Sequence, residues 1–191
     1  MNNDRNRRRD IMNCMLRLVV EQGIQNTPMS QLAKEAGVAA GTIYHHFPSK
    51  EFLINELYLD SKEAFGKAIM VNFTQDKSYR EKFEIVARNI YDFYVDHEIN
   101  FLFSEQISRS TLITAENRRL GELNYMPILE FLELGIKLKE LRSMEVELMA
   151  QLIYSNISAA LHLHLSDCLI MTEERLKTVI ASSWDGIKYK L

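Results

Sequence analysis

Apolar residues recur at helical spacing along most of the chain. In the first segment they fall on one side of a helix, at Ile11, Met15, Leu18 and Val19. Gly23 follows at a position where a helix would end. The same spacing recurs over residues 49–73, 78–97, 99–108, 115–141, 144–165 and 172–189. Because no stretch alternates apolar and polar residues as a half-buried strand does, the pattern predicts an all-α protein.

Two shorter helical segments separate the first helix from the long ones. Thr27 is expected to cap a helix that starts at Pro28 and ends near Gly37. A second short helix is expected over residues 40–46, ending before Pro48. Ser49 is then placed to cap the helix predicted over residues 49–73.

These elements predict a small head of three helices followed by a larger helical body. The expected division is residues 1–48 for the head and residues 49–191 for the body. The helix over residues 49–73 joins the two parts. Within the body, Pro127 should kink or divide the helix over residues 115–141, because proline removes a backbone donor inside a helix.

Composition supports this picture and adds an asymmetry of charge. Apolar residues make up 47% of the chain, and only 7 Gly and 3 Pro are present, which favours packed helices over a loop-rich fold. Residues 1–50 hold seven Lys or Arg against four Asp or Glu, a net charge of +3. The whole chain has a net charge of −3, so the remaining residues carry −6. A basic front on an acidic body suits a polyanionic partner for the front alone.

Nothing in the chain predicts export or membrane insertion. The apolar stretch after the basic N-terminus is interrupted by Asn13 and Arg17, and no run reaches the length of a transmembrane helix. Cys14 and Cys168 lie far apart in apolar helical segments, so we expect buried free thiols in a reducing compartment. The expected location is the cytoplasm.

The two short helices form the pattern of a helix-turn-helix. Gly37 permits the tight turn, and Ile43 and Phe47, one helical turn apart, would bury the second helix against the first. Such a short helix buries little area, so we expect its outer face to contact a binding partner. The residues left pointing outward are Gly41, Thr42, Tyr44 and His45.

This segment resembles the TetR (tetracycline repressor) family of bacterial transcriptional regulators. The matching stretch reads "MSQLAKEAGVAAGTIYHHFPSKEFL", with a Leu-Ala pair, Ala-Gly-Val at the turn and Gly-Thr-Ile-Tyr in the recognition helix. The likeness covers roughly residues 7–55 and is architectural beyond them. It implies an operator-binding head, a body that binds a ligand and dimerises, and repression relieved by a small molecule.

The resemblance also implies roles for individual residues of the recognition helix. Tyr44 and Lys50 match positions that contact DNA phosphates. Thr42 and His45 match positions that reach base edges or nearby phosphates. Gly41 would allow the backbone to approach the DNA closely.

Two further pairs extend the predicted DNA-binding surface. Arg7 and Arg8 are expected to form an arm to the neighbouring phosphate backbone, although a solvated terminus explains them equally well. Ala39 and Ala40 open the recognition helix where many relatives carry a polar residue. Since Ala40 can meet a thymine methyl but cannot hydrogen-bond to a base, sequence reading should depend more on the other side chains and on DNA shape.

The neighbouring histidines raise the alternative of a metal or catalytic site. Adjacent residues of a helix point about 100° apart, so His45 and His46 are poorly placed to share a metal. We expect His45 to face outward and His46 to lean inward. No nucleophile motif, nucleotide loop or isolated carboxylate pair occurs elsewhere, so no enzyme, metal or cofactor is expected.

The expected ligand pocket lies in the body. Asn156 interrupts an apolar helical face, and its amide requires a partner that a ligand, the protein or water would supply. Tyr94, Tyr125 and Phe131 are aromatic candidates for the lining, with an ordinary core role as the alternative. These residues suggest an apolar or amphipathic ligand.

The last two predicted helices hold more apolar surface than one small body needs. A symmetric four-helix interface between two copies would bury it. The residues expected at this interface are Ile153, Ile157, Leu161, Leu165, Leu176, Ile180 and Trp184. Two heads would then reach successive major-groove segments of a palindromic double-stranded operator.

The sequence therefore predicts a homodimeric, ligand-responsive, operator-binding transcriptional regulator. We expect a repressor that a small apolar or amphipathic effector releases from DNA. The alternative is a helical small-molecule-binding or adaptor protein that does not bind DNA.

Overall fold

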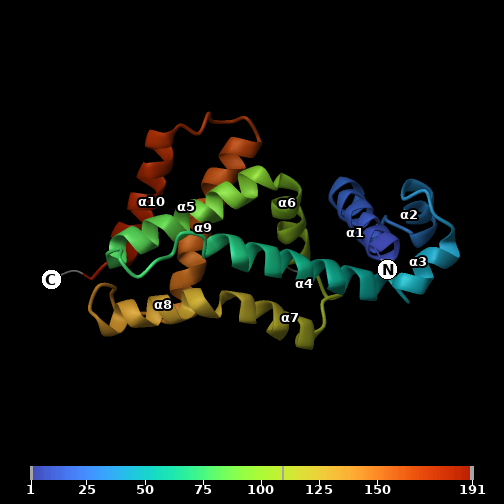
Figure 1. Cartoon of the computed structure of the whole chain (residues 1–191). Coiled ribbons are helices and arrows are strands. Elements are labelled where there is room, and N and C mark those ends of the chain that lie inside the picture. The colour runs from blue at the N-terminus through green and yellow to red at the C-terminus, as the bar shows by residue number, and fades with distance from the viewer. Residues whose placement is uncertain (1, 109, 190–191) are drawn as a thin grey trace. The chain divides into compact units, whose positions relative to one another are not determined.

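The structure, a computed structural model, describes residues 2–108 and 110–189 (Figure 1). Its helices are α1 (Asn2–Gln22), α2 (Met29–Glu35), α3 (Ala40–His46), α4 (Lys50–Ile69), α5 (Tyr79–Asp96), α6 (Glu98–Ile107), α7 (Ala115–Glu122), the 3₁₀ helix η1 (Leu123–Tyr125), α8 (Met126–Lys137), α9 (Val146–Leu165) and α10 (Glu173–Ile187). Over the described residues no strand forms, and an isolated β-bridge joins Leu141 to Lys188. The predicted all-α class is confirmed. Every helix in this part of the chain is too short or too polar to cross a membrane.

The chain folds into two compact units. Unit 1 comprises the chain as far as Glu63 together with His97–Gly121, and unit 2 comprises Ala64–Asp96 and the chain from Glu122 onward. Helix α4 starts in unit 1 and ends in unit 2. The predicted division of roles between residues 1–48 and 49–191 stays a prediction, because packing does not report which residues bind DNA or ligand.

Unit 1 has an aliphatic core built around the two short helices. Ile11 and Met15 of α1, Leu32 of α2 and Ile43 of α3 are completely buried in one cluster. Phe103 of α6 joins the same cluster, which is why α6 belongs to this unit although it follows α5 in the chain.

A buried amide fixes α4 to the segment before α7 in unit 1. The Asn55 Nδ2 donates to the Leu112 carbonyl oxygen (2.9 Å), and the Thr114 backbone N–H donates to Asn55 Oδ1 (3.1 Å). The Asn117 Nδ2 donates to the same oxygen at 2.8 Å. These bonds offset the cost of removing the Asn55 amide from water.

Unit 2 packs α5, α8 and α10 against α9. Its interior is rich in aromatic rings. Phe83 of α5 lies 5.3 Å from Trp184 of α10, measured between ring centroids. The Tyr79 ring stacks on Phe131 at 4.3 Å, and its hydroxyl donates to the Phe131 carbonyl oxygen. Burial raises the pKa of Tyr79, so this hydroxyl keeps its proton and its hydrogen bond.

Most of the predicted helix boundaries are confirmed. Gly23 ends α1 with φ of +84°, a conformation that glycine adopts without strain. The backbone N–H of Phe52 donates to Ser49 Oγ (3.1 Å), so Ser49 caps α4 as expected. Pro127 lies in the first turn of α8 and divides the predicted helix over residues 115–141.

Three details differ from the sequence expectation. The Thr27 hydroxyl donates to the Gly23 carbonyl oxygen (2.9 Å) instead of capping α2, where Pro28 occupies the cap position. Helices α4 and α8 end earlier than predicted, before Asn72 and Lys139, which adopt positive φ. Cys168 is exposed rather than buried, because it lies in the turn after α9.

Candidate nucleic-acid interface

Helices α2 and α3 form a compact helix-turn-helix whose turn depends on Gly37. This residue has φ of +64°, which a side chain would strain. The Val38 backbone N–H donates to the Ala33 carbonyl oxygen (3.0 Å) and closes the end of α2. Ile43 and Phe47 are completely buried beneath α3. Burial of two such side chains contributes about 3–5 kcal/mol and holds α3 on unit 1.

The outer face of α3 is polar and open to solvent. Gly41 and His45 are exposed, Thr42 is half-buried, and Tyr44 is 53% exposed. Ala40 is also exposed at the start of the helix. The structure therefore brings these predicted residues together on one face. Their contact with DNA stays a prediction.

The two histidines of α3 point in different directions, as expected. His45 is exposed, whereas only 6% of the His46 side chain is exposed. The His46 Nε2 lies 3.5 Å from Asp4 Oδ1 of α1, so this ring helps to hold α3 on the first helix. In residues 2–108 and 110–189 no group of three or more metal-ligating side chains gathers.

Lys50 opens α4 directly after the recognition helix. It is half-buried and stands in the first turn, where unpaired backbone N–H groups favour an anion. Glu51 occupies the same turn and competes for those groups. Hydrogen bonds from its own backbone N–H and from the Ser49 hydroxyl lower the pKa of Glu51. An approaching phosphate therefore meets both a cation and a carboxylate here.

The two predicted arginines of α1 have different surroundings. Arg7 is exposed. Arg8 forms an ion pair with Glu56 of α4, and its guanidinium lies 5.0 Å from the centroid of the Phe47 ring. Because Arg8 contacts α4 and the residue that anchors α3, it helps to position the recognition helix. The contact of Arg7 and Arg8 with DNA stays a prediction.

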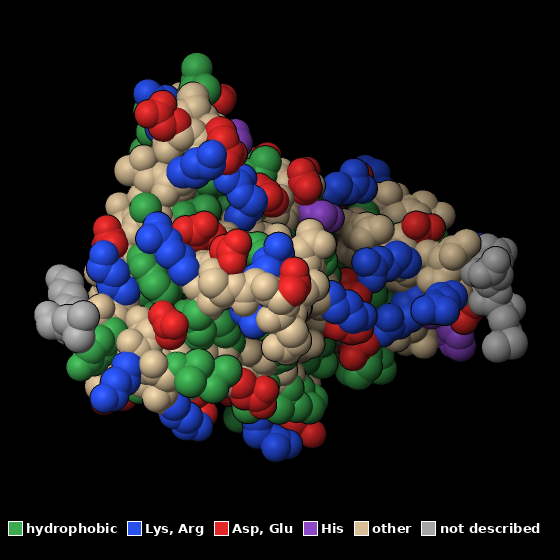
Figure 2. All heavy atoms as spheres, turned by 60° about the vertical axis from the view of Figure 1, so that its left-hand side comes forward, with side chains coloured by type: hydrophobic (Ala, Val, Ile, Leu, Met, Phe, Trp, Pro, Cys, Tyr) green, Lys and Arg blue, Asp and Glu red, His purple; other side chains and the backbone are tan. Residues whose placement is uncertain are grey.

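Lys and Arg side chains gather over unit 1, on the right of Figure 2. The nearby Arg9 forms an ion pair with Asp60 at 2.6 Å, which reduces the positive charge available there. The sequence does not predict the contacts of Arg8 and Arg9 with α4, because their partners lie about fifty positions away in the chain. Local sequence patterns cannot indicate pairs at such a separation.

The four predicted pocket residues do not form one site in unit 2. Tyr94 stacks on Phe65 (5.0 Å between centroids), and Tyr125 meets the same ring edge-on (5.7 Å). Phe131 belongs to the separate cluster of Tyr79. Asn156 lies exposed on the outer side of α9, so its amide faces water rather than the core.

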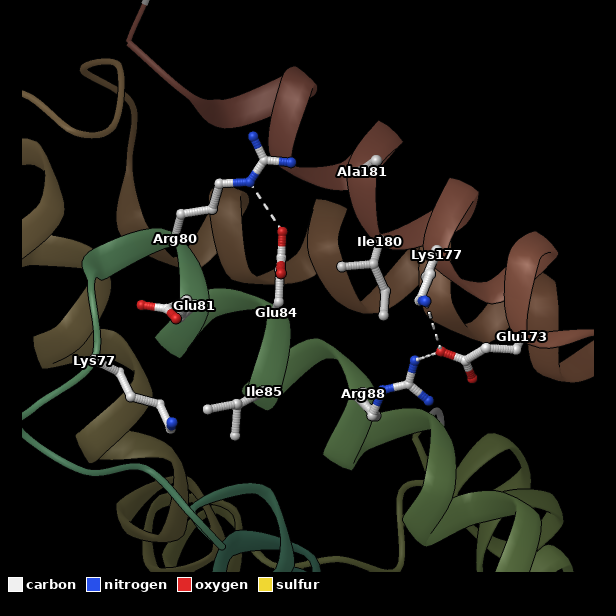
Figure 3. A pocket seen from close by; sticks show the side chains of 10 residues that line it. All are labelled: Lys77, Arg80, Glu81, Glu84, Ile85, Arg88, Glu173, Lys177, Ile180 and Ala181. Carbon is white, nitrogen blue, oxygen red and sulfur yellow. Dashed lines mark hydrogen bonds and ion pairs between the residues drawn. The ribbon is translucent and has the colours of Figure 1, made fainter.

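A surface groove of about 610 Å³ lies between α5 and α10, and it contains none of those four residues (Figure 3). Arg88 of α5 and Lys177 of α10 both pair with Glu173, at 2.5 and 3.7 Å. The Arg80 Nε donates to Glu84 at 2.9 Å. Because its carboxylates already neutralise these cations, the groove is an ion-pair network that ties α5 to α10.

The residues predicted at a dimer interface lie mostly inside unit 2. Six of them are buried within the chain and Leu165 is half-buried; the six are Ile153, Ile157, Leu161, Leu176, Ile180 and Trp184. They stabilise the core of this unit. The apolar residues that α9 exposes are instead Leu148, Leu152 and Leu163, which the sequence reading did not select.

A sequence model of the family described as "Bacterial regulatory proteins, tetR family" matches residues 13–57, which span α1 to the first turns of α4. The chain is also 26% identical over 152 residues to the Fatty acid metabolism regulator protein of Bacillus subtilis (strain 168). That alignment covers 77% of each chain, so it extends well beyond the helix-turn-helix.

Solved structures share the whole fold. A TetR family transcription regulator from Marinobacter aquaeolei VT8 has a TM-score of 0.92 at 18% identity, with 99% of both chains covered. The transcriptional regulator FadR from Bacillus subtilis, solved in complex with stearoyl-CoA, has a TM-score of 0.70 at 20% identity and covers 92% of this chain and 95% of its own. The helix-turn-helix therefore carries the sequence signature of the tetR family of bacterial regulatory proteins over residues 13–57, and the likeness to a regulator relative extends into the body, which supports a ligand-responsive, DNA-binding regulator of transcription.

Proposed function

We propose that this chain is a repressor that binds a palindromic double-stranded operator as a homodimer and leaves it when an acyl-chain amphiphile binds. One observation carries the DNA-binding part of the proposal. Helix α3 buries Ile43 on its inner face and presents Tyr44 and His45 to solvent on its outer face. A helix this short has no further intramolecular use for that outer face.

The proposed contacts divide into positioning and reading. The Tyr44 hydroxyl, the Lys50 ammonium and the Arg7 guanidinium bind phosphates and fix the register of the helix on the duplex. Thr42 and His45 reach base edges in the major groove. Gly41 and Ala40 allow the backbone of α3 to come close to the DNA, and Ala40 contacts a thymine methyl.

The homodimer is proposed to form through α9 and α10. Helix α9 exposes Leu148, Leu152 and Leu163, which a second copy would cover. From its second turn onward one side of helix α10 exposes small residues, at Thr178, Ser182 and Gly186, so another helix can approach this side closely. Two copies of α3 would then meet half-sites about 34 Å apart, one helical turn of DNA.

The effector class is proposed from relatives and from the interior of unit 2. The Bacillus subtilis relative is named for fatty acid metabolism, and a FadR of this fold was solved with stearoyl-CoA. Phe65, Tyr94 and Tyr125 pack together in the interior of unit 2, so a ligand that enters between them would meet aromatic rings, which suit an acyl chain better than a polar metabolite. A long-chain acyl thioester is therefore the first effector to test.

Release is proposed to work by population shift through α4. This helix runs without interruption from Lys50 in unit 1 to Ile69 in unit 2. An effector that binds one arrangement of the body more tightly shifts the dimer toward head spacings that no longer match the operator. The role is regulatory rather than catalytic, and its place is the cytoplasm, where the operator lies.

A gel-shift titration with the DNA upstream of the chain's own gene tests the proposal. We expect a retarded complex at low salt that stearoyl-CoA abolishes, while coenzyme A and stearate at equal concentration leave it intact. A complex that stearoyl-CoA leaves unchanged would reject the effector class and keep the DNA-binding role. Absence of any complex at low salt would instead support an adaptor protein without DNA binding.

A further inference from the structure

We propose that two carboxylates of α4, Glu56 and Asp60, strengthen operator binding although they carry the same sign of charge as the DNA phosphates. They act through Arg8 and Arg9 of α1, with which they form a charged clamp that holds α3 and the start of α4 in one arrangement. This role rests on the proposed operator binding and assigns positioning residues to it. All four residues belong to unit 1.

The charged clamp consists of two neighbouring ion pairs between α1 and α4. Arg8 and Glu56 form the inner pair. Arg9 and Asp60 form the outer pair, in which the Arg9 Nη1 lies 2.6 Å from Asp60 Oδ1. Because Glu56 and Asp60 are four residues apart, their carboxylates lie on the same side of α4. Two successive turns of α4 are therefore linked to the beginning of α1.

Arg8 also reaches the residue at which the recognition helix ends. Its guanidinium lies 5.0 Å from the centroid of the completely buried Phe47 ring. A cation at this distance from an aromatic face is attracted to it. The Arg8 Nη1 also donates to the Met12 sulfur (3.4 Å), one turn further along α1. Arg8 thus contacts α4 and the end of α3 together, and the carboxylate of Glu56 fixes its guanidinium there.

A third polar contact links the same face of α1 to α3. Asp4 precedes Arg8 by four residues and so lies on the same side of α1. The Asp4 Oδ1 lies 3.5 Å from the Nε2 of His46, the last residue of α3. This face of α1 therefore spans the junction between α3 and α4, where residues 47–49 connect the two helices.

The charged clamp affects orientation more than stability. The side chains of the inner pair are 38% and 32% exposed, and those of the outer pair are 58% and 38% exposed. Ion pairs with this much access to water add little to the free energy of unfolding. Burial of Ile43 and Phe47 already holds α3 on unit 1. What the two ion pairs add is a fixed direction of α4 relative to α3.

Operator binding requires this fixed direction because it uses both helices at once. In the proposed complex α3 reads base edges, while Lys50 in the first turn of α4 binds a phosphate. Such a set of contacts tolerates displacements of only about 0.5 Å. If the charged clamp is broken, α4 can shift against α3, and the two kinds of contact no longer form together. Non-specific binding depends on charge alone and does not require this arrangement.

Charge reversal of Glu56 separates the charged clamp from simple electrostatic attraction. Glu56→Lys places a second cation beside Arg8, and we expect operator affinity in fluorescence anisotropy titrations to fall about tenfold. Attraction between the whole chain and DNA predicts the opposite, because the variant is more positive than the unmodified chain. On a scrambled duplex of the same length, Glu56→Lys should bind at least as tightly as the unmodified chain.

Exchange of the two partners provides the rescue. Arg8→Glu/Glu56→Arg restores an ion pair without changing the net charge, and we expect operator affinity within about threefold of the unmodified chain. Arg8→Glu alone should remain weak. Asp60→Lys, in the more exposed outer pair, should lose less affinity than Glu56→Lys. Glu116→Lys makes the same charge change at an exposed residue of α7 in unit 1 and should not weaken operator binding.

The outcomes separate the charged clamp from operator binding itself. Absence of any complex between the unmodified chain and its upstream DNA at low salt would overturn the proposed function and this inference together. Tighter operator binding by Glu56→Lys would overturn the charged clamp alone. So would an exchanged pair that binds the operator no better than Arg8→Glu. Urea unfolding shows that each variant used in these comparisons is folded, so that a loss of affinity reports on orientation.

Discussion

Helices α3 and α9 both bury one face and present the other, yet their outer faces differ in kind. The seven residues of α3 expose a tyrosine, a histidine and a glycine beside a lysine. The twenty residues of α9 expose leucines around a serine and an asparagine. The first face carries hydrogen-bond donors, which suit the proposed polyanion, and the second is largely apolar, which suits the proposed second copy.

The exposure of a side chain alone does not identify its binding partner. Tyr44 and Leu148 are exposed to a similar degree. What separates them is the chemistry of the neighbouring residues and the length over which it repeats. Two buried side chains hold α3 in place, whereas a long row of buried side chains holds α9.

The largest effect is expected from removing the anchor of α3. Phe47→Ala deletes a completely buried ring, so the free energy of unfolding of unit 1 should fall by about 3–5 kcal/mol. Phe52→Ala, at a residue that is 45% exposed, should cost less than about 1 kcal/mol. Urea unfolding followed by circular dichroism checks both values. A small loss for Phe47→Ala would mean that α3 is held by other contacts.

The outer face of α9 is tested by placing a charge among its exposed leucines. Leu152→Glu should raise the dimer dissociation constant at least a hundredfold, about 3 kcal/mol, because an unpaired carboxylate would be buried between the copies. Leu138→Glu alters an exposed leucine that follows α8 and should leave the dimer intact. Analytical ultracentrifugation measures both constants. Equal dimer dissociation constants for the two variants would show that the interface does not include this face of α9.

The outer face of α3 is tested through its flanking cation. Lys50→Ala should weaken operator binding about tenfold at low salt and reduce the salt slope by about 0.9, the value for one phosphate contact. Lys177→Ala, on α10 of unit 2, should change neither. Fluorescence anisotropy titrations at several salt concentrations give both quantities. An unchanged salt slope for Lys50→Ala would show that Lys50 does not contact a phosphate of the operator.

The smallest effect concerns the carboxylate beside Lys50. Glu51→Gln should tighten operator binding by less than about threefold, since it removes a negative charge near a phosphate. Because local hydrogen bonds lower the pKa of Glu51, its carboxylate stabilises the folded chain at neutral pH, and this stabilisation is lost as the pH falls through that lowered pKa. Glu51→Gln should therefore flatten the acid limb of the stability curve slightly. Weaker operator binding by this variant would argue against a phosphate at α4.

Much of the fold was predictable because its signals are local. Gly23, Ser49 and Pro127 mark helix ends by their own chemistry, and the structure places each where that chemistry predicts. Asn72 and Lys139 end helices through positive φ without being glycine. Tertiary packing decides such positions, so the predicted helices ran too long.

The two outer faces were predictable to different degrees for a physical reason. In α3 and the residue that follows it, Ile43 and Phe47 are the large aliphatic or Phe side chains, so the inner face is unambiguous. Helix α9 carries large apolar residues on its outer side as well as on its inner side, and periodicity cannot tell whether Ile153 or Leu152 faces the core. For the same reason the sequence places Asn156 on a buried face, whereas the structure exposes it.

Hydrogen-exchange mass spectrometry of the dimer, free and bound to its upstream DNA, tests the assignment of the two faces most directly. We predict that DNA slows exchange in peptides covering Ala40–His46 and the start of α4, and leaves peptides of α9 unchanged. The α9 peptides should already exchange more slowly than in the Leu152→Glu monomer. Protection by DNA that appears in unit 2 and not in α3, or equal exchange of α9 in dimer and monomer, would contradict the account.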